Sequence, residues 1–570
     1  MGQSHPQRAF GASPTPVSAV PLMPWRWISR PGFAGPHGGA TRPVMMGRIG
    51  AVAAVHPLGS LVGLDVLREG GNAFDAAVAA SAVVSLGEPH MSGVGGGCAA
   101  TVYHAMSDRS MTLDLFRTLG PSSVDGGSSQ GATGLATAAP PGMVAGWAAL
   151  LDRYGTMKLD RLLRPAVEYA RLGVPVSFML SAVIESVGKN SGPYSAKRGE
   201  GFLDPRASKI FMPQGRPLRP GEPLVQEELS ATLRTICDEG PTAFYRGRIA
   251  REIVEACAAA GGHISAADLG AVAAEWRPSL HGAYRAHEVQ TISAQALETL
   301  ELMSGFEFKG FGFDSADHIH TLIECIKVAQ GDRVAHEMDR SFDARGLFQR
   351  DHIAQRLSEI DPTRPASGLA DELGTPWWSW PAAPGSRETP AAHSPSSETT
   401  HLVTADRWGN LVSLTQSLGR HFGSRAMAGN TGILLNDLYP TITGRVWGGV
   451  APSIVMSPAG APWMTVGSPA KSAETVPQMI SHVVDFALNP QAAVEAPRIS
   501  VFRRYVVMME TRMPEETRAE LTRMGHECVI AGEWAFAESQ LGRGQMIVRD
   551  GTGVLFGASD PRGDGAAQAL

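Results

Sequence analysis

Residues 396–419 read SSETTHLVTADRWGNLVSLTQSLG, and they join a linker-like segment to two strand-like segments. Pro, Ala and Ser are frequent over residues 376–398, a composition typical of an exposed linker. THLVTAD and NLVSLTQS are β-branched and apolar, and turn residues at 407–410 separate them. The stretch therefore predicts a linker that ends where a β-hairpin begins.

The hairpin starts with a threonine that has a hydroxyl opposite it. A hairpin centred on Trp408 places Thr399 across from Ser417, with the Cβ atoms about 5 Å apart. A threonine hydroxyl is a weak nucleophile, but an N-terminal threonine has its own α-amine as a base, with a pKa of about 7.7–8. Cleavage of the Glu398–Thr399 bond would create that base. Taken alone, the local pattern favours an ordinary linker that enters an ordinary strand.

Composition excludes several classes of protein. The chain has 570 residues, 43% of them hydrophobic and 18% charged, which fits a globular protein of one large or two ordinary domains. The net charge is −6 and there is no long basic run, so we expect no nucleic-acid partner. The five cysteines are scattered and form no CxxC pair, so neither a disulfide framework nor a zinc ribbon is predicted.

The N-terminal segment carries no clear targeting signal. It lacks a charged n-region followed by a long apolar segment, and no apolar run approaches the roughly 18 residues that span a membrane. We therefore expect a cytoplasmic protein without membrane contact, with a periplasmic or secreted location as the alternative. Residues 1–44 are predicted to form a mobile tail.

Helical patterns dominate the first part of the chain and strand patterns the second. Two small-residue helices are predicted on either side of Gly70 and Gly71, with Asn72 or Asp75 capping the second. Residues 140–330 are mostly helical in pattern, with apolar positions at i, i+3, i+4 and i+7. After Thr399 the segments become β-rich. The order of elements predicts an α/β fold.

A series of short motifs runs along the chain in a fixed order. They are GGNAFDAAVAAS, EPHMSGVGGG, APPGMVAGW, DRYGTM, GPTAFYRG, GGHISAADL, HGAYRAHEV, ETTH, DRWGN, TGILLND, GSP and GASDPR. The ordered set resembles the γ-glutamyltransferase (glutathione hydrolase) family of N-terminal-nucleophile hydrolases, from about Gly47 to Gly565. The glycine-rich EPHMSGVGGG lacks the lysine and hydroxyl of a nucleotide-binding loop and favours close backbone packing.

The resemblance implies a fold and a maturation route. The fold is a four-layer αββα sandwich made as a proenzyme that cuts its own Glu398–Thr399 bond. The large-subunit portion, 45–398, and the small-subunit portion, 399–570, then stay associated as one intertwined domain. Thr399 attacks an acyl carbonyl, Ser417 supplies a supporting hydroxyl, and water or an amine releases the acyl group. The resemblance implies no cofactor.

The residues that hold a glutamyl group depart from the family pattern. Arg117 stands where the family binds the α-carboxylate, but Thr118 replaces the glutamate that normally follows. No acid occupies the place of the amine-binding aspartate, and Asp437 is close to that place but offset. Gly448 and Gly449 replace two adjacent serines.

Two further departures lie close to the reacting groups. The position after the supporting hydroxyl, usually an asparagine, is Gly419. The GSPGG oxyanion loop reads GSPAK, so backbone N–H groups of Ala470 and Lys471 replace those of two glycines. The Lys471 side chain either favours an anionic acyl group or points to solvent.

We therefore expect an amidohydrolase or acyltransferase that acts on a small-molecule amide. γ-Glutamyl amides such as glutathione are the family default, and the departures predict an altered acyl group. The alternatives are an acylase for another acyl group, a hydrolase of a natural-product pathway, and a non-catalytic relative that is never processed. His318 and His320 lie at i and i+2, which do not share a helix face, so we predict no metal site.

Overall fold

The computed structural model describes most of the chain outside the N-terminal segment and several loops. The described residues are 40–116, 134–189, 201–336, 342–365, 398–438, 449–501, 506–532 and 541–570. Arg117, Thr118, Gly448 and most of the predicted linker therefore lie outside them. No helix of the described part is both long and apolar enough to cross a membrane.

Two sheets of seven strands each form the centre of the described structure. In order across the first sheet the strands are β19 (Ala566–Ala569), β2 (Gly50–Ala54), β10 (Glu398–Asp406), β11 (Leu411–Gly419), β3 (Gly97–His104), β4 (Arg109–Asp114) and β7 (Trp276–Pro278). Across the second they are β1 (Met45–Gly47), β18 (Leu555–Ser559), β17 (Gln545–Arg549), β13 (Pro462–Gly467), β12 (Ser453–Met456), β9 (His287–Thr291) and β8 (Leu280–Tyr284).

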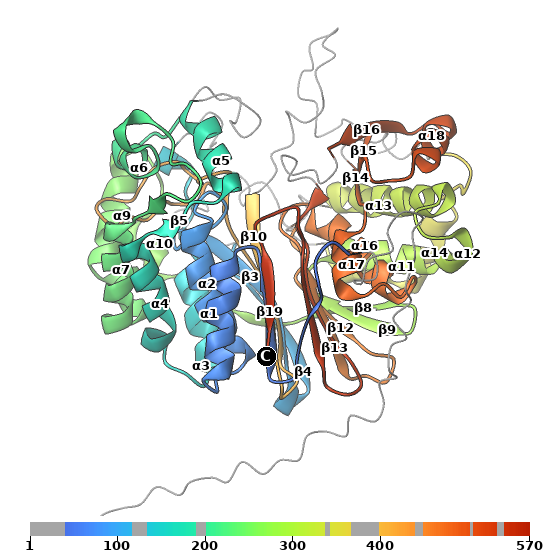
Figure 1. Ribbon diagram of the computed structural model, residues 1–570, viewed down its shortest axis with the longest axis horizontal. Coiled ribbons are helices and arrows are strands. Elements are labelled where there is room, and N and C mark those ends of the chain that lie inside the picture. The colour runs from blue at the N-terminus through green and yellow to red at the C-terminus, as the bar shows by residue number, and fades with distance from the viewer. Residues whose placement is uncertain are drawn as a thin grey trace, which may run out of the picture.

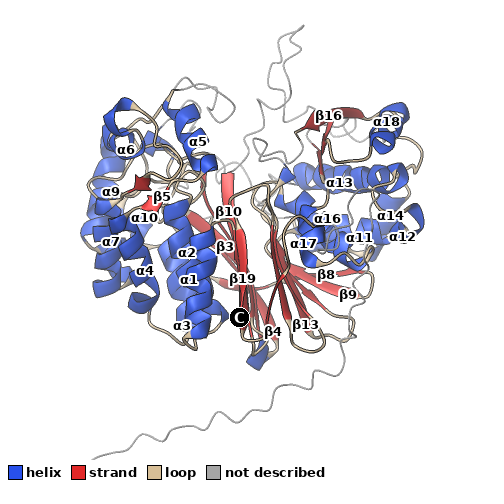
Figure 2. Ribbon diagram, viewed as in Figure 1, coloured by secondary structure: helices blue, strands red, loops and turns tan. Residues whose placement is uncertain are grey.

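Helices cover the outer face of each sheet, which gives four layers (Figures 1 and 2). Beside the first sheet lie α1 (Pro57–Arg68), α2 (Ala73–Gly87), α3 (Met143–Tyr154), α4 (Leu159–Leu172), α5 (Phe178–Gly188), α6 (Pro205–Phe211), α7 (Glu227–Glu239), α8 (Pro241–Arg246), α9 (Arg248–Ala259) and α10 (Ala266–Gly270). Beside the second lie α11 (Ala294–Ser304), α12 (Phe308–Phe311), α13 (Ala316–His336), α14 (Arg350–Leu357), α16 (Ser472–Val484), α17 (Pro490–Glu495) and α18 (Glu515–Met524).

Two small sheets complete the described structure: β14 (Ile499–Val501), β15 (Val506–Glu510) and β16 (Glu527–Ala531) form one, and β5 (Val174–Pro175) and β6 (Pro223–Leu224) the other. The arrangement confirms the predicted αββα sandwich.

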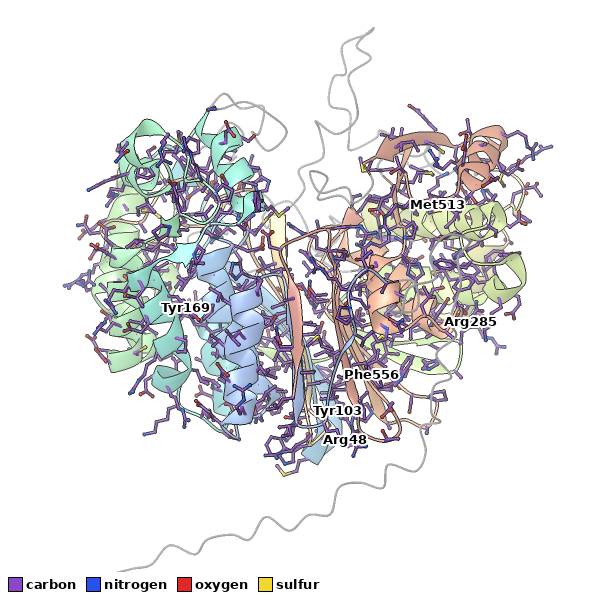
Figure 3. The ribbon with its side chains drawn as sticks, in the orientation of Figure 1. Arg48, Tyr103, Tyr169, Arg285, Met513 and Phe556 are labelled. Carbon is purple, nitrogen blue, oxygen red and sulfur yellow. The ribbon has the colours of Figure 1, made fainter. Side chains whose placement is uncertain are left out.

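Strand β10 shows how the sequence builds the layers. Leu402 packs into the core between the first sheet and its helices, whereas Val403 and Ala405 pack into the core between the sheets. Tyr103 lies in that second core, which side chains fill in Figure 3. Successive side chains of a strand point to opposite faces, and here both faces are buried. The strand is therefore buried from Thr399 to Asp406, and the polar side chains of Thr400, His401 and Thr404 make hydrogen bonds inside the protein.

The turn of the hairpin is fixed by one carboxylate. Asp406 Oδ1 accepts hydrogen bonds from the backbone N–H groups of Trp408 and Asn410, at 2.9 and 3.0 Å. Its Oδ2 accepts from the Ala73 N–H at 2.9 Å, at the start of α2. Asn410 is a turn residue, as predicted, and the register centred on Trp408 is confirmed from Thr400 to Ala405.

Both predicted capping residues act at the start of α2. Asn72 Oδ1 accepts from the Asp75 N–H, and the Asp75 carboxylate accepts from the Asn72 N–H, which is a capping box. The break at Gly70 and Gly71 is confirmed, since α1 ends at Arg68 and α2 begins at Ala73.

Two parts of the chain differ from the expectation. The largely helical region 140–330 also supplies β7, β8 and β9, whose short strands are hard to detect among helices. Residues 40–44 were assigned to the mobile tail, but the Thr41 N–H donates to Glu495 Oε2 at 2.6 Å and Arg42 Nη1 donates to the Gly565 carbonyl at 2.9 Å.

Candidate active site

A β-bulge lies at the predicted cleavage point. Glu398 pairs with Gly419 and Thr400 pairs with Gln416, so one residue of β10 faces two residues of β11. The extra residue, Leu418, bonds outside the hairpin: its N–H donates to the Met91 carbonyl and its carbonyl accepts from the Asp437 N–H. Bulges are frequent next to active sites, where they redirect a side chain or end the pairing.

Thr399 and Ser417 have their hydroxyl oxygens 3.4 Å apart, and both residues are buried. Ser417 Oγ also accepts a hydrogen bond from the Gly419 N–H at 2.8 Å. The gap between the hydroxyls exceeds an ideal O–H···O distance, but contacts between a nucleophile and its partner are often loose before substrate binds. The structure therefore brings together the two hydroxyls that the sequence predicts as neighbours.

The residue after the nucleophile anchors the strand to the first helical layer. Thr400 Oγ1 donates to Ser92 Oγ at 2.9 Å, and Gln416 Nε2 donates to the same oxygen at 2.9 Å. Gln416 also bonds to Ser81 and Ser85 on α2. This buried network, which sequence analysis did not detect, holds the residue next to each of the two hydroxyls in place.

The glycine loop packs against the same strand ends, as the sequence predicts. A Cβ at Gly96 would collide with the Ser417 carbonyl, and one at Gly95 would collide with the Leu434 carbonyl. Gly97 pairs with Ser417 in the sheet and lies against Phe116. Arg117 itself lies outside the described residues.

His401 connects the hairpin to the second sheet. It is two residues after Thr399, so the two side chains share the face that meets that sheet. The ring bonds to Thr415 Oγ1 at 2.9 Å and Ser413 Oγ at 3.2 Å, and Gly467 leaves room for it. Burial lowers the pKa of His401 to about 3, so the imidazole is neutral and has a packing role.

The predicted oxyanion loop follows a strand that packs beside the hairpin of Thr399. Val466 accepts a hydrogen bond from Ser413, and the next residue, Gly467, packs on His401. Strand β13 therefore ends beside His401, two residues after Thr399. Ala470 and Lys471 follow within four residues and precede the N-terminus of α16. Helix N-termini present backbone N–H groups and favour negative charge.

Ala470 and Lys471 both have a left-handed backbone, with φ of 50° and 43°. That conformation is strained for residues with a Cβ and explains why glycines suit these two positions. The Lys471 side chain follows neither sequence expectation. Its Nζ donates to Glu474 Oε1 at 2.9 Å and to the Val501 carbonyl at 3.1 Å.

Asp437 lies beside the hairpin, but its carboxylate is engaged. Oδ1 accepts from the Arg420 N–H at 2.9 Å, and Oδ2 forms an ion pair with Arg420 Nε. Gly419 has a φ of 100°, and a Cβ there would collide with Asp437 Oδ1. Sequence analysis did not detect Arg420, and its position next to Gly419, a predicted site residue, was the available signal.

The glycine pair is only partly visible. Gly448 lies outside the described residues, and Gly449 is exposed with open space where a side chain would be. Two residues later the Ala451 N–H donates to Ser472 Oγ at 3.0 Å, in the first turn of α16. Gly449 therefore lies near the oxyanion loop.

Taken together, these features define a class of protein. A threonine lies at the start of a central strand of an αββα sandwich, a second hydroxyl faces it, and a helix N-terminus follows a strand of the facing sheet. This is the arrangement of an N-terminal-nucleophile hydrolase, in which a chain-initial side chain attacks a carbonyl.

Comparison with known proteins identifies the family. The gamma-glutamyltranspeptidase family model matches residues 59–570. The chain is 30% identical over 559 residues to the glutathione hydrolase proenzyme of Escherichia coli, covering 90% of each chain. It is 30% identical over 561 residues to the acylase ACY 1 proenzyme of Pseudomonas sp. (strain SE83), covering 92% of this chain and 94% of that protein.

A solved structure agrees with the sequence comparison. Cephalosporin acylase from Bacillus halodurans superposes with a TM-score of 0.79 at 27% identity, covering 95% of this chain and 99% of that one. The chain belongs to the gamma-glutamyltranspeptidase family. It is an enzyme of a family that includes hydrolases and acyltransferases of differing acyl specificity.

Proposed function

We propose that the protein cuts its own chain before Thr399 and then uses this residue to hydrolyse or transfer the acyl group of a small-molecule amide. The observation that carries the proposal is the pair of hydroxyls 3.4 Å apart at the bulge that contains the Glu398–Thr399 bond. The proenzyme names of the relatives support it.

Self-cleavage needs no outside reagent except water. Thr399 Oγ1 attacks the Glu398 carbonyl carbon, the C–N bond breaks, and the nitrogen gains the proton that the hydroxyl loses. Water hydrolyses the resulting ester to a Glu398 carboxylate and restores the Thr399 hydroxyl. The new α-amine has a pKa near neutrality and accepts the hydroxyl proton in later cycles.

Acyl transfer uses the same atoms. Thr399 Oγ1 attacks the amide carbonyl of the substrate, the amine leaves with a proton, and the acyl group remains as an ester on the threonine. Water or an acceptor amine then releases it. The backbone N–H groups of Ala470 and Lys471 at the start of α16 stabilise the negative oxygen of each tetrahedral intermediate.

The acyl group of the proposed substrate has a carboxylate but no α-ammonium. A γ-glutamyl group carries both, and its ammonium needs a carboxylate that is open to the substrate. Arg420 binds both oxygens of Asp437, one through its guanidinium and the other through its backbone N–H, so this carboxylate is not open to an α-ammonium. Arg117 is the proposed partner of the acyl carboxylate. Relatives named as acylases, beside those named as glutathione hydrolases, support an altered acyl group.

Two matched substrates test the proposal. Glutaryl p-nitroanilide differs from γ-glutamyl p-nitroanilide only by the missing α-amine. We expect kcat/KM for the glutaryl compound to be at least about tenfold higher, or roughly 1.4 kcal/mol in transition-state binding. The uncut Thr399→Ala variant should be inactive on both. An equal or reversed preference would return the assignment to γ-glutamyl amides such as glutathione.

A further inference from the structure

The hydroxyl of Ser468 lies inside the predicted oxyanion loop and makes two hydrogen bonds. Its Oγ donates to the Pro469 carbonyl at 2.9 Å and accepts from the Arg543 N–H at 3.0 Å. The Ser468 side chain is fully buried. Because a backbone N–H can only donate, the bond from Arg543 leaves the hydroxyl proton for the Pro469 carbonyl.

The segment that holds Ser468 is fixed from outside the loop. Gly542, with a φ of 70°, lies so close to Ser468 Oγ that a Cβ there would collide with it. The buried guanidinium of Arg498 donates to the carbonyls of Leu541 and Gly542, at 2.9 and 3.1 Å. The Arg543 N–H, which follows directly, therefore has a fixed place beside the hydroxyl.

The bond to the Pro469 carbonyl sets the direction of the next N–H group. In a planar trans peptide the C=O and the following N–H point in opposite directions. Since Ser468 Oγ lies on the carbonyl side, the Ala470 N–H points away from Ser468. Ala470 is buried, yet no residue in the described part of the chain accepts a hydrogen bond from this N–H. Buried N–H groups are nearly always paired, and an oxyanion hole is a place where one is kept for the substrate.

This orientation is strained because position 470 is an alanine. Ala470 has a φ of 50°, in the left-handed region that disfavours residues with a Cβ. Rotation of the Pro469–Ala470 peptide by about 180° would carry this φ to roughly −130°, which alanine adopts freely. The same rotation would turn the carbonyl toward the place that the N–H now faces. A glycine adopts both conformations and has no such preference.

We propose that Ser468 is a positioning residue, which holds the Pro469–Ala470 peptide in the orientation that presents the Ala470 N–H to the negative oxygen of the tetrahedral intermediate. The inference rests on the proposed function, which assigns that N–H to the oxyanion. Ser468 acts through the peptide rather than on the substrate. Its hydroxyl opposes the strain that the alanine introduces, so the effects of the two residues are coupled.

The second N–H of the predicted oxyanion hole has separate support. The Lys471 side chain bonds to Glu474 and to the Val501 carbonyl, and neither contact involves Ser468. Loss of the Ser468 hydroxyl should therefore cost one of two donors. Complete loss of one donor typically lowers kcat by about 10²–10³-fold. We expect a loss of about tenfold to 10²-fold, since some molecules would keep the observed orientation.

Turnover by the cut enzyme tests the inference. For the p-nitroanilide that the wild type prefers, Ser468→Ala should lower kcat by this factor and leave KM within about twofold, because the oxyanion forms only during the chemical steps. Rates are counted per cut chain, from the intact mass of each preparation. Ser230→Ala is the matched control, since its buried hydroxyl donates to the Val167 carbonyl, also at 2.9 Å. This control should keep both constants.

A double variant separates positioning from general support of the fold. Ala470→Gly removes the strain, so Ser468→Ala should cost only about twofold in kcat when it is added to Ala470→Gly. A merely structural hydrogen bond would cost the same in both backgrounds, and that result would overturn the inference. If Ser468→Ala alone stays uncut, the double variant carries the test. It should cut itself and turn over substrate, and its failure to do so would also overturn the inference.

A boronic acid reports on the oxyanion hole without turnover. In 4-boronobutanoic acid, boron replaces the carbonyl carbon of a glutaryl group. Thr399 Oγ1 adds to boron, its proton passes to the α-amine, and boron becomes tetrahedral and negatively charged. The inhibition constant should rise in Ser468→Ala by about the factor by which kcat/KM falls. An unchanged inhibition constant would contradict the inference.

The same measurements distinguish failure of this inference from failure of the proposed function. A wild type that stays uncut, or that hydrolyses neither anilide, would reject the proposed function and the inference with it. A cut and active wild type whose kcat does not change in Ser468→Ala would reject the inference alone.

Discussion

At the scale of single residues, the candidate site depends on the hydrogen bonds of Thr399. Its hydroxyl faces Ser417 Oγ, which is held by the Gly419 N–H at 2.8 Å. Thr399 Oγ1 is the donor in the contact between the two hydroxyls, so Ser417 Oγ accepts from both Thr399 and the Gly419 N–H. Ser417 therefore acts on the nucleophile through a hydrogen bond, and the peptide to be cut lies within the same bulge.

Ser417→Ala should slow both self-cleavage and substrate turnover. Loss of a positioned proton-transfer partner typically costs about 10²-fold in rate. Ser417→Thr keeps the hydroxyl and should recover most of the activity. Cleavage rates from timed mass spectra and kcat from p-nitroaniline release measure the two effects. Normal rates in Ser417→Ala would remove Ser417 from the mechanism.

Arg420→Gln should change the preference between acyl groups. Without the guanidinium, the Asp437 carboxylate can pair with an α-ammonium. We expect the glutaryl to γ-glutamyl ratio of kcat/KM to fall about tenfold. Asp437→Asn also breaks the ion pair but provides no carboxylate, so it is the control that should not favour γ-glutamyl substrates. An unchanged ratio in Arg420→Gln would show that Asp437 does not contact the acyl group.

At the scale of elements, the loop between β13 and α16 carries the clearest sign of strain. Ala470 and Lys471 adopt left-handed conformations in succession, each costing about 1–2 kcal/mol relative to a relaxed backbone. The ion pair from Lys471 to Glu474, within the first turn of α16, helps to hold this shape. The element thus keeps the geometry of a glycine pair without the glycines.

Ala470→Gly should raise the free energy of unfolding by about 1 kcal/mol, because glycine adopts a positive φ without steric cost. Ala473→Gly, three residues later in α16, should lower it by about 1 kcal/mol through helix propensity. Chemical denaturation of both variants measures the difference. A loss of stability in Ala470→Gly would contradict the strain argument.

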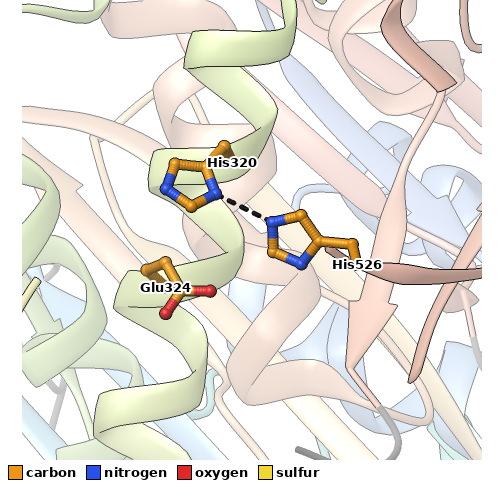
Figure 4. Close-up of side chains that lie close together, drawn as sticks. All are labelled: His320, Glu324 and His526. Atoms are coloured by element: carbon orange, nitrogen blue, oxygen red, sulfur yellow. Dashed lines mark hydrogen bonds between the residues drawn. The ribbon is translucent and has the colours of Figure 1, made fainter. Parts of the chain in front are cut away.

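The sequence predicted elements better than contacts. The hairpin, its register and the break before Asn72 follow from alternation, turn residues and caps, which are local signals. The Asp437–Arg420 ion pair and the contacts of Lys471 depend on which side chains the tertiary fold brings together. The hydrogen bond between His320 and His526 joins residues far apart in sequence, so no local spacing predicts it (Figure 4). Arg117 and Gly448 remain predictions from the resemblance.

At the scale of the whole molecule, the two predicted fragments are interleaved. In the first sheet, β10 lies between β2 and β11, and β11 pairs with β3. In the second, β1 pairs with β18 and β9 with β12. Each sheet therefore contains strands from both sides of the Glu398–Thr399 bond. Separating the fragments would break both sheets, which accounts for their predicted association.

Acid should destabilise the folded molecule through its buried histidines. Burial lowers the pKa of His401 and of His318 to about 3 each, with His482 adding to the effect at His318. The unfolded chain binds more protons between about pH 6.5 and 3, so the stabilisation is complete above that range and is lost as pH falls. Each histidine should lower the free energy of unfolding by about 2 kcal/mol at pH 5.

Unfolding free energies at pH 7.5 and pH 5 measure this dependence. His318→Asn keeps an acceptor for the Asp314 N–H but cannot titrate. Its loss of stability between the two pH values should be smaller than that of the wild type by about 2 kcal/mol. Parallel losses in the two proteins would show that His318 does not contribute.

The central claim is that Thr399 becomes the first residue of a chain, and the intact mass of the purified protein tests it most directly. The wild type should give two masses, matching residues 1–398 and 399–570, and the smaller piece should begin TTHLV. Thr399→Ala should give the mass of the uncut chain. A wild type that also stays whole after long incubation would contradict the account, because the amine base would never form.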